Sequence, residues 1–140
     1  MRAYEIKKFL SSELFSRMKK AKKVYRELRF NLLLPATLFT QNEEQKKAIS
    51  GKEVLVQGVI DCIIEHTDGT FELIDYKTDR LSREELKDRS LAEKKLNEKH
   101  SMQLSYYALA VEKMFGKAPS KIRVYSLPLG DTVEIDCVML

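Results

Sequence analysis

The chain has 140 residues, of which 44% are hydrophobic and 33% charged, and its net charge is +4. This composition predicts a single globular α/β or α+β domain over residues 1–140. No run approaches the roughly 20 apolar residues of a membrane span, and residues 1–10 lack the apolar segment of a signal peptide. We therefore expect a cytoplasmic protein with no membrane partner.

The two cysteines, Cys62 and Cys137, both stand in strand-like runs. Two cysteines are too few for an iron–sulfur cluster or a structural zinc site. A free buried thiol is the usual state of a cysteine in such a run, and we expect it for both residues.

The basic residues are concentrated at the start of the chain. Within the first thirty residues stand Lys7, Lys8, Arg17, Lys19, Lys20, Lys22, Lys23, Arg26 and Arg29. Such a cluster suits a polyanion such as nucleic acid, and a solvated helix face explains it equally well.

The first third of the chain predicts two helices followed by a strand. The first helix covers residues 3–9, and the second has Ser11 or Ser12 as its N-cap, Glu13 in its first turn, and runs through Lys20. Residues 24–34 alternate as a strand, with Leu28, Phe30 and Leu32 on one face and Tyr25, Glu27, Arg29 and Asn31 on the other. Pro35 ends this strand, and the polar residues 40–52 predict an exposed loop.

A β-hairpin is predicted at the centre of the chain. Its strands are residues 54–65 and 71–77, and Gly69 supplies the left-handed residue of the loop between them. In that loop geometry His66 pairs with Thr70.

Counting back along both strands sets Asp61 opposite Asp75, with their Cβ atoms about 4.5–5.5 Å apart. Lys77 lies two residues past Asp75 and so on the same face. A divalent metal between the carboxylates, with the lysine beside it, explains why two like charges are placed together. A protonated carboxyl, another register, or an ordinary solvent-facing surface neutralised by Lys77 are alternatives.

The rest of the chain predicts one helix and two strands after a charged connection. Residues 78–100 predict one or two short surface helices or a partly ordered crossover. Residues 101–115 predict a helix, on which Gln103 and Tyr107 are neighbours because they are four apart. Strands follow at residues 121–127 and 132–138, which gives the order ααβββαββ.

Four short signatures follow one another along this chain: Arg26-Glu27-Leu28 with Phe30, Gly58-Val59-Ile60-Asp61, Asp75-Tyr76-Lys77-Thr78-Asp79, and Gln103 followed by Tyr107. In this combination and spacing the chain resembles the C-terminal nuclease domain of the RecB and AddA subunits of bacterial ATP-dependent helicase–nucleases. These domains are a branch of the PD-(D/E)XK superfamily. The resemblance implies a restriction-endonuclease-like fold, a mixed central sheet flanked by helices.

The resemblance also implies roles for six residues in metal-dependent DNA hydrolysis. Asp61 and Asp75 would be ligands of Mg²⁺ or Mn²⁺, and Lys77 would be the catalytic lysine. Glu27 would be a supporting acid at the edge of the site, and Gln103 and Tyr107 would support the site or contact DNA. The implied role is that of an exonuclease or endonuclease domain in double-strand-break repair and recombination. Its partners would be DNA, the helicase portion of the same parent chain and a second subunit.

One departure from the family concerns a histidine. Members of this branch usually add a metal-ligating histidine from a preceding helix, and neither His66 nor His100 occupies that place. We therefore expect a fragment of a longer polypeptide whose cleavage of DNA is weak or undetectable on its own. The alternatives are a stand-alone PD-(D/E)XK nuclease and a catalytically idle module that binds DNA or a subunit.

Overall fold

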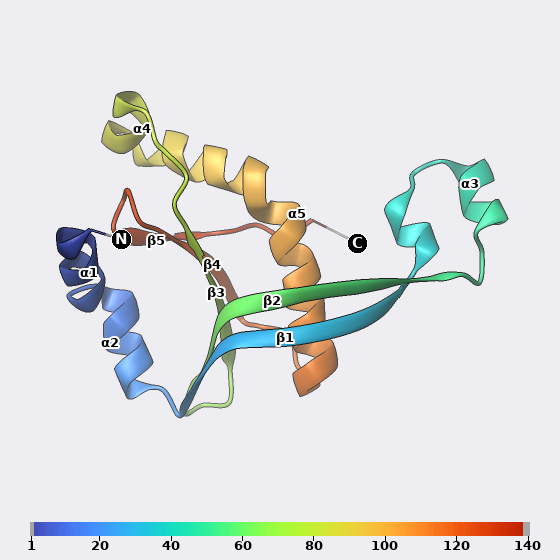
Figure 1. Ribbon diagram of the computed structural model, residues 1–140, viewed down its shortest axis with the longest axis horizontal. Helices are drawn as coiled ribbons and strands as arrows, with labels where there is room; N and C mark the ends of the chain where they lie inside the picture. Colours follow the sequence, from blue (N-terminus) through green and yellow to red (C-terminus); the bar gives the residue numbers. More distant parts are fainter. Residues whose placement is uncertain (1, 139–140) are drawn as a thin grey trace.

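The computed structural model describes residues 2–138, which form one mixed sheet with helices against its faces (Figure 1). Along the chain the elements are α1 (Ala3–Leu10), α2 (Glu13–Lys20), β1 (Lys23–Pro35), the 3₁₀ helix η1 (Ala36–Phe39), α3 (Glu43–Ala48), β2 (Glu53–Glu65), β3 (Phe71–Lys77), α4 (Arg83–Lys87), α5 (Arg89–Phe115), β4 (Lys121–Ser126) and β5 (Asp131–Glu134). This is the predicted order, with η1, α3 and α4 added.

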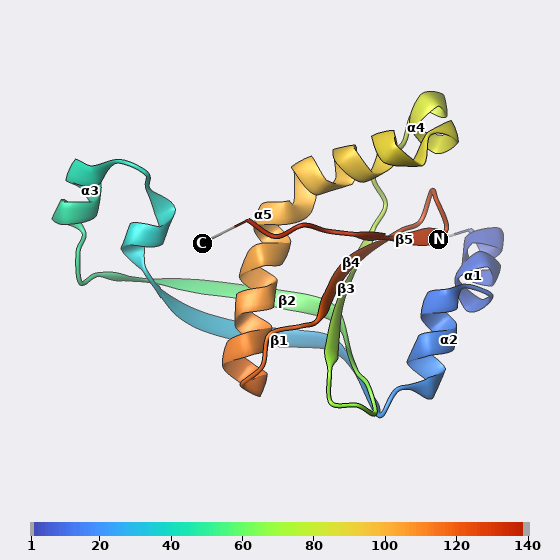
Figure 2. The same ribbon diagram turned by 180° about the vertical axis from the view of Figure 1, so that it is seen from behind.

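The five strands stand in the sheet in the order in which they occur in the chain, from β1 to β5. All neighbouring pairs are antiparallel except β3 and β4, which are parallel. A parallel pair needs a long crossover connection, and α4 with α5 provides it. Figure 2 shows α5 in front of the sheet and α1 with α2 beside β3 and β4. The predicted α/β fold with a mixed central sheet is confirmed.

Two apolar clusters hold the helices to the sheet. On the side of α5, buried residues such as Ile63, Leu73 and Leu104 form the larger cluster. On the other side, Leu14 and Met18 of α2 pack against the strands. Each fully buried side chain of this kind stabilises the fold by about 1.5–3 kcal/mol. The sheet is therefore a rigid platform between two helical layers.

The predicted hairpin between β2 and β3 is present. The His66 backbone N–H donates to the Thr70 carbonyl oxygen over 2.9 Å. Gly69 has a φ of +87°, the left-handed conformation that the loop requires. This turn fixes the register of the two strands that carry the aspartates.

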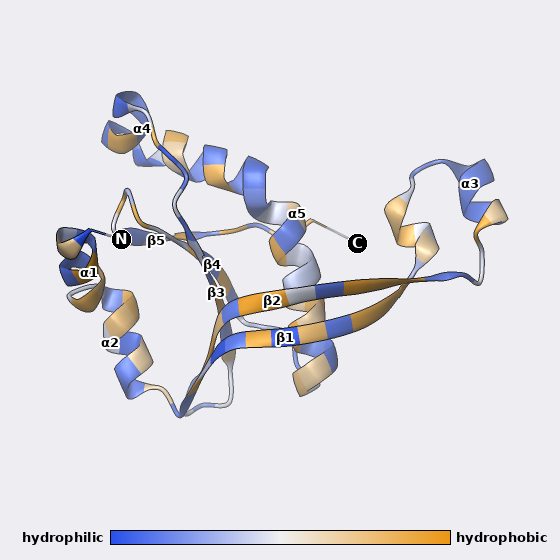
Figure 3. Ribbon diagram, in the orientation of Figure 1, coloured by the Kyte–Doolittle hydropathy of each residue, from blue (hydrophilic) through white to orange (hydrophobic). Residues whose placement is uncertain are grey.

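The outer halves of β1 and β2 form a two-stranded arm that extends past β3 (Figure 1). In this arm each strand has three consecutive apolar residues, at 32–34 and 54–56, whereas α3 at the tip is mostly hydrophilic (Figure 3). Phe39 of η1 stacks on Tyr106 of α5 with ring centroids 5.7 Å apart. The prediction of an irregular loop over residues 40–52 was wrong, because Asn42 caps a short helix there.

Helix α5 begins twelve residues before its predicted start at Ser101. The added part of the helix packs against the core through one narrow stripe. In this stripe Ala92, Leu96 and His100 are buried at intervals of four residues. The prediction considered only the leucines of this segment, which are too sparse to define a buried face. The N-terminal half of α5 therefore belongs to the core and not to a surface connection.

The two cysteines lie in different surroundings. Cys62 is buried, as predicted, and burial raises the pKa of its thiol to about 11. Cys137 is exposed, because β5 ends at Glu134 and not at Val138. No helix within residues 2–138 is long and apolar enough to cross a membrane.

Candidate functional site

The site lies where β2 and β3 separate. Their pairing runs from Glu65 opposite Phe71 to Cys62 opposite Ile74 and stops there. In this register Asp61 and Asp75 are the next residues along the two strands, as the sequence predicts. Instead of continuing the ladder, the Tyr76 backbone N–H donates to Asp61 Oδ2 over 2.9 Å. The strands therefore separate at the two aspartates, which leaves both carboxylates at the mouth of a fork.

Glu27 of β1 lies beside this fork. Arg26 pairs with Cys62 and Leu28 with Ile60, which places Glu27 opposite Asp61. Glu27 has a φ of +50°, a conformation that costs a residue with a Cβ about 1 kcal/mol or more. An open cleft of about 500 Å³ is lined by Arg26, Glu27, Asp61 and Tyr76. The structure thus brings the predicted supporting acid to the site's edge.

The distortion at Glu27 reverses the alternation of β1. Tyr25 and Leu28 both pack toward α5, although they are three residues apart. Ile60 and Ile63 do the same in β2, on either side of Asp61. The prediction that Tyr25 shares a face with Arg29 and Asn31 was therefore wrong, because the side-chain alternation of both strands is reversed at this point.

Lys77 of β3 contacts Gln103 of α5, and Gln103 in turn contacts Tyr107 of the same helix. Lys77 Nζ lies 2.7 Å from Asp75 Oδ2 and donates to Gln103 Oε1 over 3.0 Å. The Gln103 side-chain amide in turn donates to the Tyr107 hydroxyl over 3.1 Å. Five of the six predicted site residues, Asp61, Asp75, Lys77, Gln103 and Tyr107, are thus gathered at one place, with Glu27 next to Asp61.

The electrostatics of Asp75 are unfavourable for its ionised form. Asp75 is 4% exposed. Burial, together with the neighbouring Asp61 carboxylate, raises the pKa of Asp75 to about 6, although Lys77 acts to lower it. Burial and Asp75 also raise the pKa of Tyr107. Asp75 Oδ2 accepts no aligned hydrogen bond from any described residue. One lysine therefore leaves part of the negative charge at the fork uncompensated.

The two carboxylates fit a divalent cation as part of its ligand set. Oxygen ligands suit Mg²⁺, which usually keeps several waters and is held by one or two carboxylates together with substrate phosphates. Within residues 2–138 no group of three or more histidine, cysteine, aspartate or glutamate side chains is arranged to hold a metal. Asp61 and Asp75 can thus supply two ligands, and the remaining positions are left to water and substrate.

Comparison with known proteins gives the family. Residues 4–134 match the model of the PD-(D/E)XK nuclease superfamily. The chain belongs to this superfamily. The resemblance to helicase–nucleases is also confirmed, since the curated relatives of this PD-(D/E)XK domain include proteins of three bacteria that are named as ATP-dependent helicase/nuclease subunits.

These relatives are much longer than this PD-(D/E)XK chain. The protein of Acetivibrio thermocellus is 34% identical over 123 residues, which is 88% of this chain and 9% of the relative. That of Bacillus cereus is 43% identical over 105 residues, 75% of this chain and 8% of the relative. That of Ruminiclostridium cellulolyticum is 35% identical over 133 residues, 94% of this chain and 10% of the relative. The chain therefore spans about a tenth of each.

Sequence reasoning missed one polar contact close to the site of this PD-(D/E)XK domain. His100 Nε2 lies 2.8 Å from Asp79 Oδ1, and both side chains are less than a tenth exposed. In the sequence analysis Asp79 appears only as the last residue of a motif, and His100 lies before the helix predicted at residues 101–115. His100, Gln103 and Tyr107 are three and four residues apart, so a predicted helix that began before His100 would have placed all three on one face.

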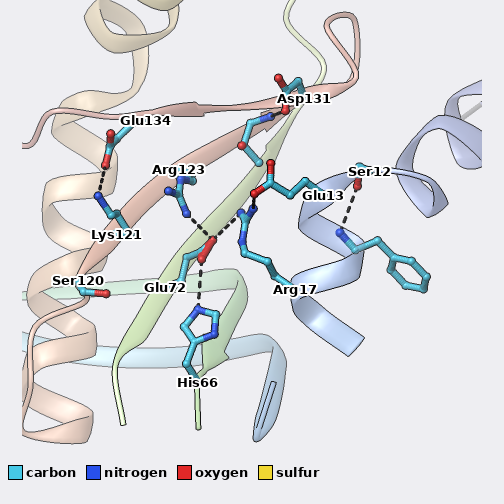
Figure 4. Close-up of polar contacts among 12 residues, drawn as sticks. Ser12, Glu13, Arg17, His66, Glu72, Ser120, Lys121, Arg123, Asp131 and Glu134 are labelled. Carbon is cyan, nitrogen blue, oxygen red and sulfur yellow. Dashed lines mark hydrogen bonds and ion pairs between the residues drawn. The ribbon is translucent and has the colours of Figure 1, made fainter. Parts of the chain in front are cut away.

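A second buried carboxylate lies on the opposite face of β3 (Figure 4). Glu72 Oε2 accepts from Arg17 and from Arg123, each over 2.9 Å, and His66 Nε2 lies 3.3 Å from Glu72 Oε1. Burial raises the pKa of Glu72, but the two guanidinium groups outweigh it and the pKa is lowered. This cluster joins α2, β4 and the hairpin turn to β3.

Proposed function

We propose that this domain hydrolyses DNA phosphodiester bonds with the help of Mg²⁺ or Mn²⁺. The observation that supports the proposal is the fork between β2 and β3, where Asp61, Asp75 and Lys77 come together with part of their negative charge uncompensated. Membership of a nuclease superfamily and relatives named as helicase/nuclease subunits agree with this chemistry.

Asp61 and Asp75 would hold the metal, which supplies charge neutralisation at the phosphate and lowers the pKa of a bound water. Asp61 is already oriented by the Tyr76 backbone N–H. Binding of a cation favours the ionised form of Asp75, whose pKa is raised in its absence. Both carboxylates would therefore hold the cation at the fork, where it would neutralise the charge of a phosphate.

Lys77 would stabilise the negative charge that develops on the phosphate oxygens. Its ammonium group is held between Asp75 and Gln103, and Gln103 is held by Tyr107. A flexible four-carbon side chain is thereby restricted to one position before DNA arrives. Glu27, which lines the same cleft as Asp61, would orient a water molecule beside that carboxylate.

The biological setting that we propose is double-strand-break repair and recombination. In this proposal the domain is the nuclease part of a larger helicase–nuclease, receives DNA from the helicase portion of the same protein, and works with a second subunit. The names of the relatives and their roughly tenfold greater length support it. A stand-alone nuclease of the same superfamily finds less support, because these relatives are helicase/nuclease subunits.

The 140-residue chain alone should cleave DNA weakly. Two carboxylates are the ligands that the fork offers, and the described residues contain no third histidine or acidic side chain in a metal-binding arrangement. The same observation favours a second candidate function, an idle module that binds DNA or a subunit without cutting. Cleavage and binding must therefore be measured separately.

The test incubates the purified 140-residue chain with end-labelled linear DNA and either Mg²⁺, Mn²⁺ or EDTA. We expect slow cleavage that requires the metal and that falls at least about a hundredfold in Lys77→Ala. Lys121→Ala is the matched control, because Lys121 is an exposed lysine paired with Glu134 outside the fork.

Three outcomes separate the candidates. Metal-dependent cleavage that survives in Lys77→Ala contradicts the proposed role of the fork. Retention of DNA on a filter without any cleavage supports the idle module. Rapid degradation of linear DNA by the wild type contradicts an incomplete metal site in the chain alone.

A further inference from the structure

Asp79 and His100 form a buried side-chain contact next to the proposed site. Asp79 follows β3 directly, and its side chain is 8% exposed. One carboxylate oxygen lies 2.8 Å from His100 Nε2, and the other forms an ion pair with Lys99. Burial raises the pKa of Asp79, but Lys99 and His100 outweigh it and lower the pKa to about 2. The Asp79 carboxylate is therefore ionised at neutral pH.

The end of β3 and the segment after it run antiparallel to α5. Lys77 reaches Gln103, Asp79 reaches His100, and the Arg80 carbonyl oxygen accepts from Lys95 over 2.6 Å. Two residues of extended chain span about 6.6 Å and three residues of helix about 4.5 Å, so successive side chains can meet across the gap. The three contacts act as successive rungs between strand and helix.

Lys77 depends on α5 for the place of its ammonium group. Its backbone is fixed by pairing with Ser126 of β4, but its side chain carries several rotatable bonds. Gln103 is the contact that α5 supplies, and it stands three residues after His100 on the same face of the helix. A contact that fixes His100 relative to β3 thus also fixes Gln103 relative to Lys77.

We propose that Asp79 and His100 are positioning residues. Their contact fixes α5, along its axis and in rotation about it, so that Gln103 contacts Lys77. The inference rests on the proposed function in one respect, since it assigns the purpose of that placement to the Lys77 ammonium in phosphodiester hydrolysis. Neither residue touches the reacting atoms in this assignment. Their effect on cleavage passes through Lys77, and therefore through the turnover rate and not through DNA affinity.

The test uses Asp79→Asn, which keeps the size of the side chain and removes its charge. His100→Gln is the second variant, which breaks the contact from the helix side if Asp79→Asn fails to fold. Asp131→Asn is the matched control, because Asp131 pairs with Arg89 of the same helix far along its sequence from Gln103. Folding of each variant is checked by its ¹H–¹⁵N spectrum.

The first readout is the side-chain amide signal of Gln103, assigned by its loss in Gln103→Glu. Lys77→Ala removes the donor to Gln103 and defines the direction in which this signal moves. Asp79→Asn and His100→Gln should move it in the same direction, and Asp131→Asn should leave it in place. A Gln103 signal that stays at its wild-type position in both variants overturns the proposal.

The second readout is metal-dependent cleavage at saturating and at limiting DNA. We expect the rate at saturating DNA to fall about tenfold in Asp79→Asn, with an unchanged concentration of DNA at half-saturation. A displaced Gln103 signal with unchanged cleavage overturns the assigned purpose of the contact. If wild-type cleavage is absent, the proposed function is contradicted, whereas the Gln103 signal still decides whether Asp79 positions the helix.

Discussion

Two buried carboxylates on β3, Glu72 and Asp75, lie three residues apart and meet opposite surroundings. They are 1% and 4% exposed, and burial raises the pKa of both. Glu72 faces two guanidinium groups and a histidine, and its pKa is lowered. Asp75 shares one lysine with a second carboxylate, and its pKa is raised to about 6. Burial acts in the same direction on both groups, and their neighbours therefore account for the opposite pKa shifts.

This difference separates a structural contact from a candidate binding site. In this cluster two guanidinium groups meet the Glu72 carboxylate, and its partners come from different elements: Arg17 from α2, Arg123 from β4 and His66 from the hairpin turn. Such a cluster ties elements together and offers nothing to a further cation. The Asp61 and Asp75 pair has the reverse balance, so that a cation from solution lowers its energy.

The largest expected effect on stability is that of Glu72→Gln. The substitution leaves Arg17 and Arg123 without their carboxylate, and we expect it to lower the free energy of unfolding by about 3 kcal/mol at pH 7. Glu134→Gln, which affects an exposed pair, should change this free energy by less than about 0.5 kcal/mol. Urea unfolding measures both, and similar values for the two variants would contradict the structural role of Glu72.

Acid should remove the effect of Glu72→Gln. The pKa of Glu72 is lower in the folded protein than its ordinary value of 4.5, so its contribution is present above that pH. The contribution is lost as the pH falls through the folded pKa. The difference between the wild type and the variant should therefore shrink below pH 4, and a constant difference would contradict the charge-based explanation.

Asp75→Asn, unlike Glu72→Gln, should raise the free energy of unfolding at high pH. The folded pKa of Asp75 is about 6 and its ordinary value is 3.8, so the unfolded chain loses its proton first as the pH rises. Wild-type stability due to this group is present below pH 3.8 and is lost as the pH rises through about 6. At pH 8 without divalent metal we expect Asp75→Asn to be more stable than the wild type by about 2 kcal/mol.

The same unfolding measurements at pH 4 and pH 8 check this prediction. The gain in stability should be small at pH 4 and full at pH 8. A variant that is less stable than the wild type at pH 8 would show that Lys77 compensates Asp75 fully, which would remove the contrast with Glu72.

The smallest expected effect concerns the backbone at Glu27. Glycine adopts positive φ without steric cost, so Glu27→Gly should raise the free energy of unfolding by up to about 1 kcal/mol. Arg29→Gly, in a regular part of the same strand, is the matched control and should lower it by about 1 kcal/mol. Equal losses in thermal unfolding of the two variants would show that no strain is stored beside Asp61.

The sequence carried enough information to place the aspartates. The hairpin register follows from Gly69 and the His66 and Thr70 pair, and period-two counting then brings Asp61 and Asp75 together. The face that joins Asp75 with Lys77 is likewise a property of a regular strand. These features depend on local conformation, which sequence patterns describe well.

Other features depend on contacts between distant segments, which no local pattern contains. The cluster around Glu72 draws residues from α2, β4 and a turn, and sequence analysis gave Glu72 no role. The reversal of alternation at Glu27 results from one positive φ. The predicted start of α5 was too late because its buried stripe includes His100, a polar residue whose partner Asp79 lies in a distant segment.

The most direct test of the metal site is calorimetric titration of Mn²⁺ into the 140-residue chain at pH 7, with Asp75→Asn and Glu134→Gln measured alongside. We predict binding of Mn²⁺ to the wild type and to Glu134→Gln, and its loss in Asp75→Asn, because the fork supplies the ligands. Absence of binding to the wild type, or equal binding to Asp75→Asn, would contradict the claim that uncompensated charge at the fork forms a metal site.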